Sequence, residues 1–494
     1  MLIWMAPERG YYCVAAAGTI EVIDLGERQL KNIAKLIRVS WRQISIPATA
    51  KPTLQKKHPA PALLATGIAA LLIMTATTAP AAAQAARLSI VALPFANLSG
   101  DPAQDYLADI LTDELTTALA RIPNSFVIAR NTAFTYKGKP FEAKAIGKDL
   151  GVRYILQGSA QSSGAQLRVN AQLFDADSGA RLWTEQFDTP RAALLQMQDE
   201  IVAHLAPAIG LQLPEVEAAR LKRTPAANPN AEDWALQCTA ATEKGGFVGE
   251  EAEATFRLCE QALGADPNNV RALSYLSLKF WFPVGLGRSA DPEADLKRAD
   301  ELVSRALALD PNYAPAHSFK ASILELQAHT DEAIAEDERA LVLDPSIVDA
   351  SAHLGWTYLG VGRFEKSHEF FDKAIEFSPR DPGLGLWVSG NTAACFGLKQ
   401  YDQAIEWAHR AIAINPTNVF AHGELIAAFA LTGREAEAHD ALDRYLALPL
   451  TGITTVAAFK AFLAQAANPH SDPRTLEGWD RTIEGLRKAG MPEE

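Results

Sequence analysis

The chain has 494 residues, of which 48% are apolar and 21% are charged. This length exceeds the usual limit of one hydrophobic core, and this composition excludes general disorder, so several folded units are expected. The net charge is −13, although residues 1–60 hold nine Lys or Arg against four Asp or Glu. The rest of the chain is therefore strongly acidic, which argues against nucleic acid as a partner.

Residues 20–44 read IEVIDLGERQLKNIAKLIRVSWRQI. This segment resembles the last strand pair of the catalytic domain of class III adenylate cyclases, so residues 1–44 are interpreted as a remnant of the C-terminus of such a domain. Cyclases of this class need two metal-binding carboxylates on separate strands. The acids near the strands, Glu21 and Asp24, fall in the closing segment instead. The resemblance therefore carries over no catalytic, metal-binding or cofactor-binding residue, and no cofactor is expected.

A basic linker over residues 45–60 leads into an uncharged apolar run over residues 61–79, PALLATGIAALLIMTATTA. As a helix of about 1.5 Å per residue, this run is barely long enough to cross a bilayer core of about 30 Å. The basic residues before it predict a single-pass protein of a bacterial inner membrane, with residues 1–60 cytoplasmic and residues 87–494 periplasmic. Two alternatives stay open: a signal peptide cleaved near Ala85, which leaves an exported periplasmic protein, and a buried soluble helix.

Residues 88–210 alternate strand and helix signals and predict a small α/β domain. Strands are expected at Ser89–Phe95, Ser125–Ala129 and Arg181–Phe187, with a hairpin of Tyr154–Gln161 and Gln166–Asp175 around Ser163-Gly164. Helices are expected at Tyr106–Ala120, Ala143–Leu150 and Arg191–Ile209. The first of these helices has apolar residues at helical spacing, so one of its faces should pack on the sheet.

Three phrases of this region occur in a familiar order: SIVALPFANLSGDPAQDYLADILTDELTTALARIP, FVIARNTAFTYKGK and LGVRYILQGSAQSSGAQLRVNAQLFDADSGARLWTEQFD. They closely resemble the TolB-like domain that follows the catalytic domain of many bacterial class III adenylate cyclases. In that family the TolB-like domain is followed by tetratricopeptide repeats, and the ending LEGWDRTIEGLRKAGMPEE also resembles the usual tail of those proteins.

The second half of the chain repeats. Helix-like runs end at five prolines: Pro267, Pro311, Pro345, Pro379 and Pro416. The two central intervals, from Pro311 to Pro345 and from Pro345 to Pro379, are each 34 residues long. The copy Val348–Pro379 carries Leu354, Gly355, Tyr358, Ser367, Phe371, Ala374 and Pro379 at the offsets of the tetratricopeptide pattern, with Ser367 in place of an Ala. Each proline is expected to end a helix because it lacks an N–H. The pattern predicts an all-α superhelix of five to six repeats over 228–450 and a helical cap over 451–494.

The first helices of such an array line its concave groove. By register with the best copy, six residues should point into it: Ser318, Ser322, Glu325, Asp349, Trp356 and Ser389. The clamp that some relatives use for a C-terminal carboxylate needs Lys and Asn there, and this set has neither. A different protein or peptide is therefore the expected partner, with Trp356 as an anchor. Ordinary packing between repeats is the alternative role for Trp356.

Four cysteines without a CxxC pair, and ten histidines without a metal-binding spacing, predict no metal site. Cys238 and Cys259 should fall at similar heights on two facing helices. An oxidising periplasm would permit a disulfide between them, whereas buried free thiols are the commoner state.

Together these features indicate a non-catalytic, membrane-anchored protein-interaction or sensory module derived from a class III adenylate cyclase. The alternative is an adenylate cyclase, or part of one, whose catalytic domain comes from a partner chain or from sequence upstream of Met1. Homo-oligomerisation stays open.

Overall fold

The computed structural model describes residues 88–122, 125–209, 229–448, 452–466 and 472–494, all of which fall in one compact unit. The predicted cyclase remnant, the basic linker and the apolar run over 61–79 lie outside the described residues. Within the described ranges, no helix combines the length and the apolar character needed to cross a membrane.

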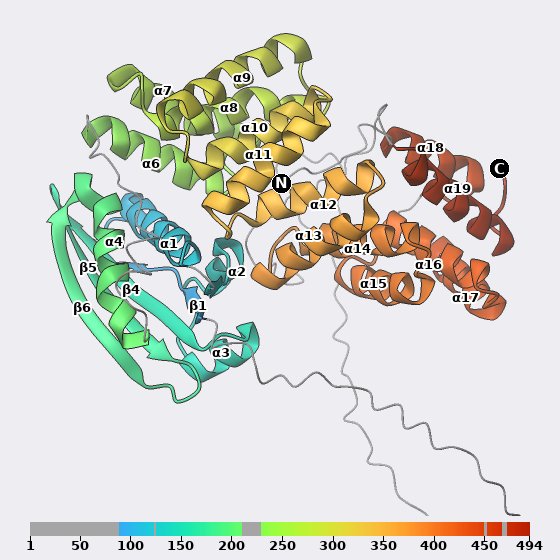
Figure 1. The fold of residues 1–494 in the computed structure, drawn as a ribbon, viewed down its shortest axis with the longest axis horizontal. Coiled ribbons are helices and arrows are strands. Elements are labelled where there is room, and N and C mark those ends of the chain that lie inside the picture. Colours follow the sequence, from blue (N-terminus) through green and yellow to red (C-terminus); the bar gives the residue numbers. More distant parts are fainter. Residues whose placement is uncertain (1–87, 123–124, 210–228, 449–451, 467–471) are drawn as a thin grey trace, which may run out of the picture. The chain divides into compact units, whose positions relative to one another are not determined.

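The N-terminal part of the described chain is a mixed sheet with the strand order β3-β1-β4-β5-β6, and β2 pairs with β4 (Figure 1). Its strands are β1 Leu88–Ala92, β2 Ala96–Asn97, β3 Ser125–Val127, β4 Tyr154–Ser163, β5 Gln166–Asp175 and β6 Arg181–Pro190. Strand β1 runs parallel to β3 and β4, whereas β4, β5 and β6 are antiparallel neighbours. The predicted hairpin is confirmed, because Ser163 pairs with Gln166 across the turn.

Helices cover both faces of this sheet. On one face, α1 Asp105–Ala120 and α4 Leu194–Leu205 share a core with the strands, and the apolar stripe expected on α1 is buried in it. On the other face, α3 Ala143–Leu150 packs near the short helix α2 Arg130–Phe134. Among the described residues, the sheet domain also has three 3-10 turns, η1 Pro102–Gln104, η2 Arg191–Ala193 and η3 Ala206–Ile209, and a fourth, η4 Gly249–Glu251, lies between α6 and α7.

The remaining described helices form six antiparallel pairs followed by a two-helix tail (Figure 1). The pairs are α6 Pro229–Glu243 with α7 Ala252–Ala265, α8 Val270–Gly285 with α9 Pro292–Leu309, α10 Ala314–Leu326 with α11 Thr330–Leu343, α12 Val348–Gly360 with α13 Phe364–Phe377, α14 Leu384–Gly397 with α15 Tyr401–Ile414, and α16 Val419–Leu431 with α17 Glu435–Leu446. The tail consists of α18 Val456–Ala466 and α19 Pro473–Lys488.

Four of the five helices that precede the repeat prolines end just before an Asp or Asn residue, which is followed by the proline. At Asp266, Asp310, Asp344 and Asn415 the backbone is extended, with φ between −147° and −130°. A following proline disfavours the helical conformation of the residue before it. Each of these side chains also accepts a hydrogen bond from the N–H two residues later, at 2.9–3.1 Å. The Asx-Pro pair, rather than the proline alone, therefore ends the helix.

Candidate functional site

The first helices of the six pairs pack side by side along the array: α6, α8, α10, α12, α14 and α16. We call the surface that they form the inner face. The six residues predicted for the groove lie on three of these helices. Ser318, Ser322 and Glu325 belong to α10, Asp349 and Trp356 to α12, and Ser389 to α14.

These six side chains differ in their exposure to solvent and in their contacts. Asp349 is exposed, whereas Ser389 is only 5% exposed. The ring of Trp356 meets that of Phe371 edge-on at 5.0 Å between centroids, so part of this tryptophan belongs to the core. Ser322 donates to the carbonyl of Ser318 at 3.2 Å, within its own helix. Glu325 is half-buried, and its Oε2 atom is buried without a hydrogen-bond partner.

Two further residues, which the sequence did not indicate as groove residues, lie near Glu325. His353 on α12 forms an ion pair through Nδ1 with Asp337 on α11, and the two side chains are 8% and 1% exposed. The outer atoms of this pair, His353 Nε2 and Asp337 Oδ1, are buried and have no hydrogen-bond partner. Three buried polar atoms from three consecutive helices are therefore unsatisfied in one region.

The charges of these groups affect the pKa values of Asp337 and His353. Burial raises the pKa of Asp337 to about 6, with a smaller contribution from Glu325, against the lowering effect of His353. Burial by itself would lower the pKa of His353, but Asp337, and then Glu325, outweigh it, so that the pKa of His353 is raised. Within the part of the chain that the structure describes, no group of three or more His, Cys, Asp or Glu is arranged to hold a metal ion.

The tail occupies another part of the inner face. Helix α19 lies along α16 and α14, and a Cβ at Gly485 would lie 2.4 Å from Cα of Ala427. Thr475 donates to the carbonyl of Leu359 at 2.8 Å, and Arg481 donates to that of Gly397 at 3.1 Å. These carbonyls belong to the last turns of α12 and α14, where the helix supplies no partner. We therefore place the candidate site where α10, α11 and α12 meet.

A second polar region joins the sheet domain to the repeats. Beside its apolar stripe, α1 carries a polar stripe of Tyr106, Asp109, Asp113, Thr117 and Arg121, spaced by three or four residues. Asp109 pairs with Lys137 of the sheet domain and, at 2.8 Å, with Lys244 of the repeats. Thr117 donates to Asp344 at 2.8 Å, and Arg121 donates to the carbonyl of Leu343 at 3.0 Å. The polar stripe thus fastens the sheet domain to the repeat array, and we call this contact the seam.

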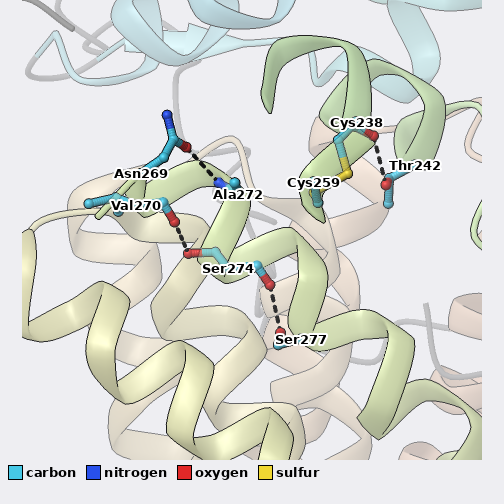
Figure 2. Close-up of a disulfide and its surroundings, with 8 residues drawn as sticks. All are labelled: Cys238, Thr242, Cys259, Asn269, Val270, Ala272, Ser274 and Ser277. Carbon is cyan, nitrogen blue, oxygen red and sulfur yellow. Dashed lines mark hydrogen bonds between the residues drawn. A yellow bond between two sulfur atoms is a disulfide. The ribbon is translucent and has the colours of Figure 1, made fainter. Parts of the chain in front are cut away.

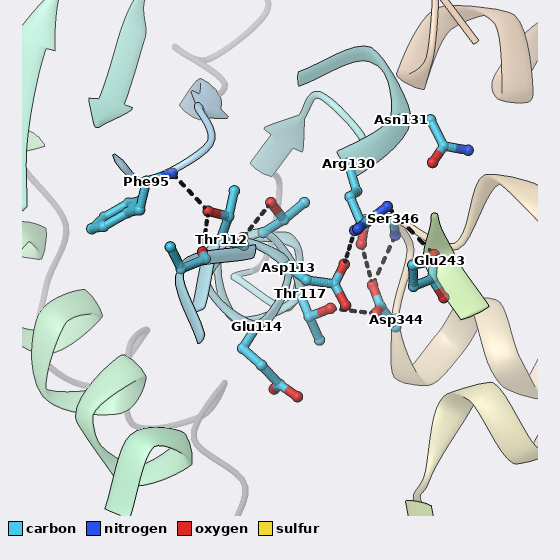
Figure 3. A network of polar contacts seen from close by, with 12 residues as sticks. Phe95, Thr112, Asp113, Glu114, Thr117, Arg130, Asn131, Glu243, Asp344 and Ser346 are labelled. Atoms are coloured by element: carbon cyan, nitrogen blue, oxygen red, sulfur yellow. Dashed lines mark hydrogen bonds and ion pairs between the residues drawn. The ribbon is translucent and has the colours of Figure 1, made fainter. Parts of the chain in front are cut away.

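One arginine at the seam is shared by two carboxylates (Figure 3). Arg130 of α2 lies 3.6 Å from Asp113 of α1 and 3.5 Å from Glu243 of α6. Burial raises the pKa of Asp113 to about 7, and Glu243, Glu114 and Asp344 add to this effect, while Arg130 opposes it. The seam therefore holds a proton on Asp113 more tightly than the unfolded chain does.

Because of Asp113, we expect the free energy of unfolding to fall as the pH rises. Between the pKa of the unfolded chain, near 4, and the folded value of about 7, only the folded state binds the proton, so stability falls by up to about 1.4 kcal/mol per pH unit. Asp113→Asn removes this dependence, so its stability relative to the parent should increase from pH 5 to pH 8. Urea midpoints at both pH values measure the difference, and parallel pH profiles would contradict the assignment.

Cys238 of α6 and Cys259 of α7 form a disulfide in the structure, with 5.5 Å between their Cα atoms (Figure 2). Facing turns of one helix pair bring the two residues to this distance, which lies in the range that a disulfide requires. Both side chains are fully buried, and Cys395 is a buried free thiol.

A thiol titration of the denatured, unreduced protein tests whether this bond forms in the cell. In protein exported to an oxidising compartment, we expect two of the four cysteines to be blocked until reductant is added. The loop that the bond closes is short, so its loss should lower the free energy of unfolding by about 2–4 kcal/mol. Four reactive thiols before reduction would show that the pair is free.

Comparison with known proteins gives three results. The family profile "Tetratricopeptide repeat" matches residues 348–381. The chain is 29% identical over 317 residues to "Putative adenylate cyclase 3" of Rhizobium meliloti (strain 1021), a match that covers 64% of this chain and 49% of that protein. The chain thus spans about half the length of this curated relative.

Among solved structures, PilF of Pseudomonas aeruginosa aligns with a TM-score of 0.37 and 18% identity, over 48% of this chain and 97% of PilF. PilW, described as a type IV pilus biogenesis factor, aligns with a TM-score of 0.33 and 19% identity, over 44% of this chain and 91% of PilW. YrrB, described as a repeat protein with an unusual peptide-binding site, aligns with a TM-score of 0.29 and 20% identity, over 38% and 94%. The family profile therefore identifies the pair α12 and α13 as a tetratricopeptide repeat, and this pair belongs to a row of six helix pairs in the described residues, beside a small sheet domain.

Proposed function

We propose that the chain is a recognition module of a membrane-bound signalling protein and that it contributes no catalysis of its own. The observation that carries this proposal is the inner face, which the first helices of consecutive pairs form side by side. Repeat arrays of this kind present surfaces for partners.

The origin and location of the module are part of the proposal. Residues 88–210 would be a TolB-like domain and residues 1–44 the end of a class III cyclase domain, as the resemblances imply. Residues 61–79 would anchor the chain in the inner membrane, with residues 87–494 in the periplasm or, after cleavage near Ala85, exported to it. Added protease should then digest the repeats in spheroplasts while cytoplasmic proteins stay intact.

The alternative function is adenylate cyclase activity, favoured by the 29% identity to a relative named as a cyclase. Cyclic AMP formation from ATP and manganese distinguishes the two, measured on the purified full-length chain beside a class III cyclase with intact metal carboxylates. We expect only background turnover. Clear turnover by this chain alone would contradict the non-catalytic assignment, whereas turnover that needs an added catalytic chain would support the alternative.

A further inference from the structure

An open hollow lies in the sheet domain, between α3 and the turn that follows β5. Its volume is about 470 Å³, within the range of about 300 to 1,000 Å³ that small-molecule sites occupy. Helix α3 and the residues that lead from it into β4 form one wall, and Ala176 and Asp177 of the turn form the other. All of the wall residues belong to the sheet domain, so the hollow is separate from the inner face of the repeats.

A glycine of α3 allows the two walls to come together. A Cβ at Gly147 would lie 2.2 Å from the Cβ of Ala176, which is closer than real side chains approach. Glycine in the interior of a helix is less favourable than alanine, so α3 gives up some helix stability for this contact with the turn. The stem of Lys144 also reaches across, because a Cβ at Gly179 of the turn would lie 3.2 Å from its Cε atom.

The charged groups at the hollow are mostly basic. Lys144, Lys148 and Arg153 line it, and Asp177 is the acid among its wall residues. A second acid, Asp175, adjoins the hollow through Arg153, since its Oδ2 atom lies 3.5 Å from Nε of that arginine. Three positive and two negative charges leave one positive charge at the hollow, although the net charge of the whole chain is −13.

The two lysines lack a partner of their own. Both are exposed, and in the part of the chain that the structure describes neither Lys144 nor Lys148 forms an ion pair. They are four residues apart on α3, where side chains are neighbours and like charges repel. An anion bound between them would remove this repulsion.

We propose that the hollow binds a phosphate group, free or carried by a small molecule, through Lys144, Lys148 and Arg153. A phosphate monoester carries about 1.5 to 2 negative charges at pH 7 and has three acceptor oxygens. The two ammonium groups and the guanidinium group come from different sides of the hollow and donate to different oxygens. A carboxylate has only two acceptor oxygens in one plane and one charge, so it suits three separate donors less well.

Calorimetric titration of the full chain tests this site. The probes are inorganic phosphate and glycerol 3-phosphate, in a phosphate-free buffer with about 150 mM sodium chloride to suppress long-range attraction. We expect saturable binding that Lys144→Gln and Lys148→Gln each weaken by about tenfold, as the loss of a charged hydrogen bond implies. The matched control is Lys297→Gln, which makes the same charge change at an exposed position of α9 and should bind like the parent. Tighter binding of glycerol 3-phosphate than of phosphate would support an organic phosphate as the ligand, and equal affinities would support free phosphate.

Three results would overturn the site. These are an absence of saturable binding by the parent, an equal loss of affinity in all three lysine variants, and displacement of phosphate by acetate at equal concentration. A second measurement uses stability, because a ligand of the folded state raises the melting temperature. Phosphate should raise that of the parent and of Lys297→Gln but not that of a Lys144→Gln/Lys148→Gln double variant, and the same shift in all of them would also contradict the proposal. Loss of this site would leave the proposed recognition on the inner face in place, since no wall residue belongs to the repeats.

Discussion

Replacing Arg271 by alanine is expected to lower the free energy of unfolding by about 3–5 kcal/mol, the usual cost of breaking one side of a buried ion pair. Arg271 lies at the start of α8 and is 9% exposed. Its Nη2 atom is 2.7 Å from Glu114 of α1, and its Nε atom is 3.4 Å from Glu232 of α6. Removing the guanidinium leaves two largely buried carboxylates without this cation. Because Glu114 belongs to the sheet domain, the loss should also weaken the seam.

A double-mutant cycle with Glu114→Ala isolates the coupling across the seam, since neighbouring partners are not additive. Arg298→Ala is the matched control: Arg298 pairs with Glu301 at 3.2 Å, but both side chains are more than half exposed. Exposed pairs contribute about 0–1 kcal/mol, so this variant should unfold close to the parent. Equal urea midpoints for the two arginine variants would refute the claim that the Arg271 pair holds the domains together.

Truncation of Phe371 to alanine is expected to cost about 3–5 kcal/mol, the range for buried aromatic side chains. Its ring is fully buried between α12 and α14. A Cβ at Gly355 or at Gly390 would come within 2.7 Å and 2.4 Å of ring atoms, so both glycines are needed for the close approach. The ring therefore fills a space shared by three helices of adjacent repeats, and its loss leaves a cavity at their junction.

Val342→Ala on α11 controls for this truncation, because Val342 is 72% exposed and should change stability by only a few tenths of a kcal/mol. Gly390→Ala tests the same contact by adding a methyl group next to the ring of Phe371. Added volume must displace a fully buried ring, so this variant should also be destabilised, by about 1–3 kcal/mol. A Phe371→Ala protein as stable as Val342→Ala would mean that the repeats do not pack through this ring.

Local patterns predicted much of the fold. The Ser163-Gly164 turn and the alternation of its two strands predicted the hairpin, and the period of 34 residues predicted the helix pairs, because the relevant contacts lie close in sequence. The apolar stripe of α1 was likewise found. The sequence did not show that the polar stripe of α1 contacts the repeats. Its partners Lys244 and Asp344 lie more than 100 residues away, and no local periodicity relates them to α1.

The candidate site was only partly predicted. Register placed Glu325 on the inner face, but Asp337 lies on a second helix, outside the set that register selects. The available signal was a mismatch: an acid and a histidine at positions where adjacent repeats have Phe371 and Phe319. The role of α19 could not be foreseen, because its contacts with α14 and α16 depend on how the tail folds back.

Site-specific photocrosslinking tests the central claim that the inner face receives a protein partner. A benzophenone amino acid placed at Ser322 of α10 should, in living cells, form a crosslinked product of higher mass on illumination. The same group at Glu332, an exposed residue of α11 in the second helix of that pair, should not form this product. A product from Ser322 alone supports recognition on the inner face. No product from Ser322, or the same product from both positions, would contradict it.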